Sequence, residues 1–256
     1  MDVLIVGAGS MGSWFGAAID ARIAFADVDD DAAAAAAETV GGEVADLEGD
    51  RTYDAVCLAV PMATVADAIA AQSERAERAI VDVSGVMQPA LAAMERHAPD
   101  RERASLHPLF APERAPGSIA VVREQSGPVT DELLAGLAAR GNDLVETTAT
   151  EHDDAMETVQ AATHAAVLSF ALAAEPVPEG FETPIYEELG RLARQVTAGT
   201  PRVYADIQAT FDGADAVADA AAAVADADAD ELAALYREAA ANWHGASDTR
   251  NESENE

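Results

Sequence analysis

Residues 2–20, DVLIVGAGSMGSWFGAAID, begin as an apolar run of strand-forming residues, pass through a glycine turn and continue with apolar residues at helical spacing. This order predicts a strand, a tight turn and a helix. Gly7, Gly9 and Gly12 have the G-x-G-x-x-G spacing. Here the first glycine permits the turn, the second lets the backbone approach a pyrophosphate, and the third lets the helix pack closely on the strand. The stretch therefore predicts dinucleotide binding, and a glycine turn without a ligand is the alternative.

A second strand is expected at residues 21–27, and it ends in Asp27 at the distance where an acid binds the ribose of a dinucleotide. A carboxylate there repels a 2′-phosphate, and no arginine follows closely, so NAD is favoured over NADP. The alternative is that Asp27 and its neighbour Asp29 simply belong to an acidic surface. The residues that we assign to the cofactor are Gly7, Gly9, Ser10, Met11, Gly12, Asp27, Val60 and Pro61.

Strand-like and helical segments alternate up to about residue 150, with further strands expected at 53–61 and 78–85. This alternation predicts an α/β fold, a Rossmann-type doubly wound parallel sheet covered on both faces. Beyond residue 150 only helical periodicity is visible. We therefore predict a dinucleotide-binding domain at 1–150, an all-helical substrate and dimerisation domain at 151–244, and a disordered acidic tail at 245–256. Whether residues 212–230, rich in alanine and aspartate, are ordered stays open.

The chain carries 47 acidic residues against 15 basic ones, all arginine, for a formal net charge of −32. Such acidity disfavours nucleic acid and anionic membranes as partners, because both would be repelled. The acidic residues are spread along the chain, as in proteins from salt-accumulating cells such as halophilic archaea, where salt screens the self-repulsion. The charge thus reports habitat more than function.

No apolar run is long enough to span a bilayer, and the first residues lack the features of a signal peptide. We expect a cytoplasmic protein. Its single cysteine, Cys57, lies in an apolar run and is expected to be a small buried hydrophobe. No cluster of histidines and carboxylates has the spacing of metal ligands, so no metal site is expected.

An enzyme that transfers hydride commonly needs a group that accepts a proton as a carbinol becomes a carbonyl, and histidine suits this role. Among the five histidines, His97 and His244 are expected at the surface. His107, His152 and His164 stand in distinctive surroundings. Residues 104–113, ASLHPLFAPE, are too apolar for a surface loop and too rich in proline for a helix. From the residues alone, a core or turn histidine remains the alternative for His107.

Three blocks in succession resemble the prephenate and arogenate dehydrogenases. LHPLFAPE, residues 106–113, is similar to their H-P-M-F-G-P motif, and residues 151–173 resemble the start of their helical domain. Residues 183–208 resemble a third block with its P-I-Y and L-Y-A-D-I elements. Together with the glycine turn, the resemblance covers residues 3–210.

The resemblance implies NAD-dependent oxidative decarboxylation of prephenate to 4-hydroxyphenylpyruvate in tyrosine biosynthesis, by a homodimer joined through the helical domain. It places His107 on the substrate hydroxyl, where a neutral imidazole accepts the hydrogen bond and polarises the group as hydride departs. Ser84 is a second candidate catalytic residue, able to donate to that hydroxyl or to the nicotinamide.

The resemblance also implies a substrate pocket formed in part by His164 and, at its mouth, by Glu113. His152 is interpreted as structural, and a satisfied core histidine is the alternative for His164. Prephenate is a dicarboxylate, so arginine is expected to bind it. The aligned position of the family's arginine holds Gln195, and we assign the role to Arg194 first and Arg191 second.

One further departure concerns residues 82–87, DVSGVM, where the family commonly has D-x-x-S-V-K. Gly85 stands at the serine position and Met87 at the lysine position. Arogenate dehydrogenase and a non-catalytic NAD-binding sensor remain alternatives to a prephenate dehydrogenase. The 3-hydroxyacid dehydrogenases and the imine reductases share the layout, and the former rely on a lysine that this chain lacks.

Overall fold

The computed structural model describes the backbone of residues 1–253 and the side chains of residues 1–243. The chain forms two compact units. Unit 1 contains residues 1–159 and 200–211, and unit 2 contains residues 160–199 and 212–256. Residues 200–211, which the sequence pattern alone grouped with the helical domain, thus belong to the unit that holds the sheet.

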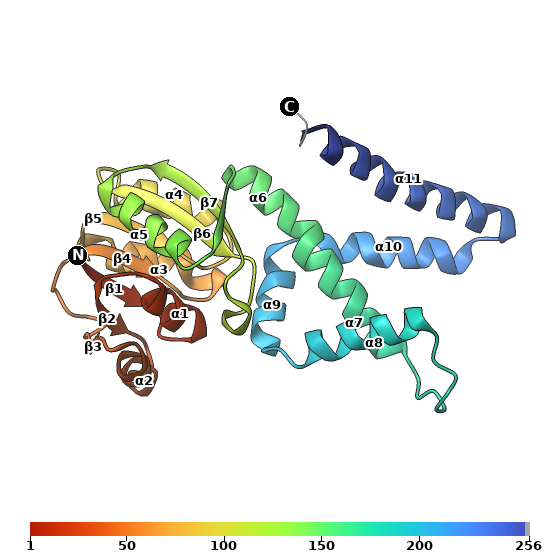
Figure 1. The fold of residues 1–256 in the computed structure, drawn as a ribbon, viewed down its shortest axis with the longest axis horizontal. Coiled ribbons are helices and arrows are strands. Elements are labelled where there is room, and N and C mark those ends of the chain that lie inside the picture. Colours follow the sequence, from red (N-terminus) through yellow and green to blue (C-terminus); the bar gives the residue numbers. More distant parts are fainter. Residues whose placement is uncertain (254–256) are drawn as a thin grey trace. The chain divides into compact units, whose positions relative to one another are not determined.

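Unit 1 is built on an eight-stranded sheet in the order β3-β2-β1-β4-β5-β6-β7-β8, drawn in Figure 1. All neighbours pair in parallel except β6 and β7, which a short connection leaves antiparallel. The predicted doubly wound sheet is confirmed, and the antiparallel pair is a departure from the parallel order that the sequence predicted. The strands are β1 (Asp2–Val6), β2 (Arg22–Ala26), β3 (Glu43–Val44), β4 (Tyr53–Leu58), β5 (Ala76–Asp82), β6 (Glu102–Pro108), β7 (Ser118–Gln125) and β8 (Asp143–Glu146).

The helices of unit 1 cover both faces of this sheet. One buried cluster joins alternate strand residues, such as Ile5, Cys57 and Leu106, to α1, α2 and α5. Contacts of α3 with β4 and of α4 with β6 cover the other face. The helices are α1 (Ser10–Ala18), α2 (Asp30–Val40), α3 (Val65–Gln72), α4 (Gln88–His97), α5 (Pro128–Ala139), α6 (Ala149–Met156) and α9 (Pro201–Thr210), with short 3-10 turns η1 (Met62–Thr64), η2 (Ser73–Arg75) and η3 (Pro112–Arg114).

Two buried arginines tie the chain at the amino-terminal edge of the sheet. Arg75, directly before β5, donates to the carbonyls of Arg51 and Leu47 and to the Gln72 side chain. Arg103, in β6, donates to the carbonyls of Pro99 and Ala98 and to the Gln125 side chain. Both guanidinium groups therefore satisfy main-chain oxygens that the strand ladders leave unpaired.

Unit 2 contains α7 (Thr163–Ala173), α8 (Pro184–Thr197), α10 (Gly213–Asp226) and α11 (Ala229–Ser253), and a π-helical segment (Glu157–Ala162) spans the division between the units. Residues 174–183 separate α7 from α8. Residues 212–230, left open by the sequence, include all of α10. Helix α11 includes residues 245–253 of the predicted tail, whose last three residues lie outside the described part of the chain.

In the described part of the chain, no helix is long and apolar enough to cross a membrane. Within the same residues, no group of three or more histidine, cysteine, aspartate or glutamate side chains is arranged to hold a metal ion. Cys57 is a fully buried thiol in β4, as expected, and burial raises its pKa well above the usual value.

Candidate functional site

The candidate residues of unit 1 gather at the carboxyl ends of the parallel strands. The strand order reverses between β1 and β4, whose connections lead to opposite sides of the sheet. In open α/β sheets, ligands bind in the crevice outside the carboxyl ends at such a point. The glycine turn follows β1, Asp27 follows β2, Ser84 follows β5, and His107 lies near the end of β6.

Two glycines of the turn have no room for a side chain. A Cβ on Gly7, whose φ is +99°, would lie 2.3 Å from the Ala59 carbonyl oxygen, and one on Gly12 would lie 2.0 Å from the Gly7 carbonyl oxygen. Gly7 thus lets the turn pass the end of β4, and Gly12 lets α1 pack on β1. Beside Gly9, in contrast, nothing lies within 4 Å of the Cβ position. The open side of the turn is where a bound pyrophosphate can approach the backbone.

The other residues assigned to the cofactor surround this turn. Ser10 and Met11 begin α1, so their backbone N–H groups belong to the unpaired first turn of the helix. Val60 and Pro61 follow β4, and the Val60 side chain packs beside Gly7. The glycines and the first turn of α1 therefore fit a dinucleotide on geometry as well as on spacing.

Asp27 and Asp29 have different roles. The Asp27 carboxylate accepts hydrogen bonds from the backbone N–H of Ala8, at 2.6 Å, and of Asp29, at 3.0 Å. It therefore links the end of β2 to the glycine turn and retains acceptor capacity for a ribose hydroxyl. Asp29 is the N-cap of α2 and accepts from the N–H groups of Asp31 and Ala32. Val28 between them is 91% exposed.

His107 is a buried residue, 8% exposed, on the face of β6 opposite to Leu106. Burial and the neighbouring His152 lower its pKa to about 3. At neutral pH the imidazole is therefore uncharged, as the proton-acceptor role requires. Its Nε2 atom would lie 3.2 Å from a Cβ on Gly85, which has a φ of +93°. The glycine after Ser84 thus leaves room for the ring and adopts a turn that favours glycine.

A hydrogen-bonded chain continues from His107 into α6. Nδ1 of His107 lies 2.9 Å from Nε2 of His152, and Nδ1 of His152 lies 2.8 Å from Oδ1 of Asp153. The Asp153 carboxylate also accepts from the backbone N–H groups of Met87 and Gln88 at the start of α4. These bonds lower the pKa of Asp153, although burial opposes them. Asp153 was not among the predicted site residues, and its position next to His152 in EHDD was the signal.

Ser84 is held by a buried acid. The Asp82 carboxylate, fully buried at the end of β5, accepts from the Ser84 hydroxyl at 2.6 Å and from its backbone N–H at 3.0 Å. Burial raises the pKa of Asp82 to about 6, and the hydrogen bonds from Ser84 limit the rise. Ser84 was among the predicted site residues, and Asp82 was not.

The loop after β6 connects His107 to the nucleotide turn. Phe110 packs edge to face on Trp14 of α1, with ring centroids 5.3 Å apart. Because the glycine turn opens α1, this contact places the carboxyl end of β6 and the nucleotide turn on the same side of unit 1. Glu113, in η3 of the same loop, is exposed, and the sequence prediction that it borders a pocket stays a prediction.

The remaining candidates lie in unit 2. His164 is in α7, and burial lowers its pKa. Arg191 and Arg194 are both exposed on α8, as is Gln195 between them and the end of the helix. The choice between the two arginines therefore stays a prediction.

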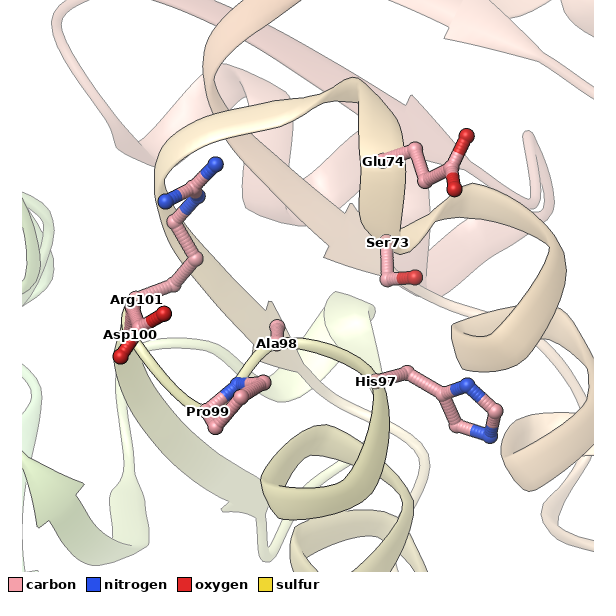
Figure 2. Close-up of a pocket in the computed structure, with 7 residues that line it drawn as sticks. All are labelled: Ser73, Glu74, His97, Ala98, Pro99, Asp100 and Arg101. Atoms are coloured by element: carbon pink, nitrogen blue, oxygen red, sulfur yellow. The ribbon is translucent and has the colours of Figure 1, made fainter.

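Figure 2 shows a hollow on unit 1 that is separate from these residues. It lies at the amino-terminal ends of β5 and β6, the edge opposite to the glycine turn. Its lining residues are Ser73, Glu74, His97, Ala98, Pro99, Asp100 and Arg101. None of them belongs to the predicted site.

No family model matches the chain. The chain is 32% identical over 236 residues to 4-amino-4-deoxyprephenate dehydrogenase of Streptomyces pristinaespiralis, covering 84% of this chain and 78% of the relative. Its fold is similar to that of prephenate dehydrogenase from A. aeolicus, solved with hydroxyphenyl propionate and NAD+ (TM-score 0.69, 15% identity, 99% of this chain and 98% of that chain). Synechocystis arogenate dehydrogenase is also similar (TM-score 0.60, 15% identity, 96% and 99%).

The lowered pKa of His107 predicts a loss of stability in acid. Its pKa is about 3 in the folded protein against an ordinary value of 6.5, so between these values the unfolded chain binds a proton that the folded chain does not. The free energy of unfolding should therefore fall with decreasing pH, by up to about 1.4 kcal/mol per unit. The raised pKa of Asp82 has the opposite effect: between about pH 6 and 3.8 it increases the free energy of unfolding as the pH falls.

Denaturant unfolding at pH 6 and pH 5, in molar salt, measures this effect. His107→Asn should lose less stability over the interval than the wild type, while Asp82 contributes equally to both. Equal losses in the two proteins would contradict the prediction.

Proposed function

Because the chain belongs to the prephenate and arogenate dehydrogenase family, we propose that it oxidises and decarboxylates prephenate with NAD to give 4-hydroxyphenylpyruvate. The observation that carries this proposal is His107, an uncharged and buried imidazole at the same sheet edge as the glycine turn. The turn follows β1 and His107 lies in β6, so β4 and β5 separate the two, and the three strand spacings correspond to about 14 Å along the edge.

The residues of the glycine turn fit the cofactor, with open space beside Gly9 and Asp27 at the end of β2. Gly7, Gly9, Ser10, Met11 and Gly12 would hold the pyrophosphate, Asp27 the ribose, and Val60 and Pro61 would border the site. The bound NAD supplies the hydride acceptor. An acid at the end of β2 favours NAD over NADP, because a carboxylate repels a 2′-phosphate.

The reacting groups follow from the geometry of His107 and Ser84. Nε2 of His107 accepts the proton of the ring hydroxyl, the carbon that bears this hydroxyl gives up hydride, and carbon dioxide leaves from the opposite side of the ring. The ring thereby becomes aromatic. The Ser84 hydroxyl donates its one proton to Asp82, so its oxygen would be left to accept a hydrogen bond in the same region. Because the pKa of His107 is held far below neutrality, the base is unprotonated before each turnover.

Substrate choice within the family rests on the groups around the ring. Arg194, or Arg191 in its place, would bind a substrate carboxylate, and His164 would line the pocket from the helical domain. The relative from S. pristinaespiralis bears the name of a dehydrogenase for 4-amino-4-deoxyprephenate, a compound with an amine in place of the ring hydroxyl. That compound and arogenate are therefore the alternative substrates. A sensor that binds NAD without turnover is the non-enzymatic alternative.

The second copy of a homodimer would cover the helical unit. Among its described side chains, few apolar ones are buried, and several large apolar ones are exposed. The exposed ones are Leu168, Leu172, Val177, Phe181, Ile185, Val224, Tyr236 and Trp243. Exposed large apolar side chains in this number on a strongly acidic protein favour an interface between subunits.

We propose that the protein works in the cytoplasm of a salt-accumulating cell, where salt screens the negative charges and lets two acidic copies associate.

Turnover tests the proposal directly. The protein in molar salt, given NAD and prephenate, should produce NADH, measured by its absorbance. The same assay with arogenate and with 4-amino-4-deoxyprephenate tests the two alternative substrates. His107→Asn should reduce turnover by about 10²-fold or more, the usual size of general-base assistance, and leave NAD affinity unchanged. NAD binding without NADH from any of the three compounds would favour the sensor.

The nucleotide turn can be tested with a matched pair of glycines. Gly9 has a φ of −69°, which alanine accepts, so Gly9→Ala should keep the stability and weaken NAD binding by roughly tenfold or more, as the methyl group fills the open space. Gly41, the C-cap of α2, has a φ of +85°. Gly41→Ala should cost about 1 kcal/mol of stability and leave NAD affinity unchanged. Calorimetric titration and denaturant unfolding measure both quantities, and the reverse pattern would refute the assignment.

The dimer can be tested by sedimentation velocity in molar salt. The wild type should sediment as a dimer, and the double variant Leu172→Asp, Ile185→Asp should sediment as a monomer, because it places charge on exposed apolar positions of α7 and α8. Val44→Asp, at an exposed position of β3 in unit 1, is the control and should remain dimeric. A monomeric wild type would refute the proposal.

A further inference from the structure

Three side chains form one buried hydrogen-bonded line behind the candidate base. His107, His152 and Asp153 are 8%, 3% and 7% exposed, and the two bonds that join them measure 2.9 and 2.8 Å. Asp153 is fixed in turn, since both carboxylate oxygens accept from N–H groups at the start of α4, at 3.0 and 2.9 Å. The line therefore runs from the first turn of α4 to the imidazole at the end of β6.

The Asp153 carboxylate determines which nitrogen of each imidazole donates a hydrogen bond and which accepts one. An ionised carboxylate only accepts hydrogen bonds, so Nδ1 of His152 must donate to Asp153. With His152 uncharged, its Nε2 is then an acceptor, and Nδ1 of His107 must donate to it. The lone pair of His107 is left on Nε2, the atom that lies next to Gly85. The orientation that a base needs at this atom thus follows from Asp153, two hydrogen bonds away.

We propose that His152 and Asp153 form a proton relay behind His107. As the substrate hydroxyl gives its proton to Nε2 of His107, the proton on Nδ1 of His107 passes to Nε2 of His152, and the Asp153 carboxylate balances the resulting charge. One O–H bond breaks and one N–H bond forms at each imidazole, while one N–H bond of His107 breaks. The hydride leaves as in the proposed function, on which this inference rests. His107 remains neutral, and His152 and Asp153 are positioning residues that act through it.

The surroundings favour a charge on His152 over a charge on His107. Burial opposes protonation of His107, whose Nδ1 atom bonds to the imidazole of His152. His152 bonds directly to the Asp153 carboxylate, and the buried carboxyl group of Asp82 also attracts a charge on it. The relay therefore explains how a weakly basic imidazole can serve as the proton acceptor: the charge comes to rest beside the acids.

A nuclear magnetic resonance measurement tests the line without any substrate. In protein labelled with ¹⁵N at histidine, at neutral pH, both His107 and His152 should carry their proton on Nδ1, with assignments made from His107→Asn and His152→Gln. A proton on Nε2 of either ring would overturn the proposal. This result does not depend on turnover, so it stays separate from a failure of the proposed function, which would appear as no NADH from the wild type.

Kinetics test the transfer itself. Glutamine can accept the bond from His107 but cannot take up its proton, so His152→Gln should lower kcat by about 10²-fold and leave both KM values within about twofold. In single-turnover NADH formation, the rate in mixtures of H₂O and D₂O should depend on deuterium content along a curve for the wild type, as two protons move, and linearly for His152→Gln. A purely structural histidine would not change the shape of this dependence.

Two further variants complete the design. Asp153→Asn keeps an acceptor for the α4 N–H groups but removes the charge, and it should lower kcat by about tenfold or more with little change in KM. Asp154→Asn removes an exposed carboxylate from the next position of the same helix and is the control, with kcat unchanged. A linear dependence in the wild type, or a His152→Gln variant that retains a third of the wild-type kcat, would overturn the relay.

Discussion

Parallel strand pairing is the constraint on which the site depends. It brings the carboxyl ends of β1, β2, β4, β5 and β6 to one edge of the sheet, although the residues that follow them are far apart in the chain. The turn at this edge packs closely against its neighbours at Gly7 and at Gly12, and neither glycine has space for a Cβ. The adjacent Gly9 does have space. A backbone that is tight on one side and open on the other suits a ligand that binds main-chain N–H groups.

Burial, more than the large surface charge, controls the chemistry of the candidate site. The 47 acidic residues of the chain favour the protonated form of a nearby histidine. Desolvation wins at His107 and holds the pKa near 3, and it raises that of Asp82 to about 6. The two effects act in opposite directions on acid stability. The fold thus keeps its base neutral by excluding water, and salt, which screens surface charges, should change this little.

The sequence allowed the first half of the site to be predicted because its signals are local. The glycine spacing, the apolar run before it and Asp27 at the end of β2 lie within about 25 residues, and the structure places them together. The contact between His107 and His152 joins residues 45 positions apart and depends on how α6 packs beside β6, so no spacing could reveal it. Asp29 was undecided until its capping of α2 was visible. The roles of Arg191 and Arg194 on α8 depend on contacts beyond one helix.

The arginines at the amino-terminal edge of the sheet suggest a structural reason why the basic residues of this chain are arginine and not lysine. Arg75 and Arg103 each reach several carbonyl oxygens from one planar, rigid group, a task for which a single ammonium on a flexible stem is poorly shaped. Their cations are buried and neutralise nothing on the surface. If every arginine were replaced by an acidic or polar residue, the loops that precede β5 and β6 would therefore lose the hydrogen bonds that hold them. The buried structure therefore sets a lower limit on the number of basic residues, while the salty solvent favours a small number.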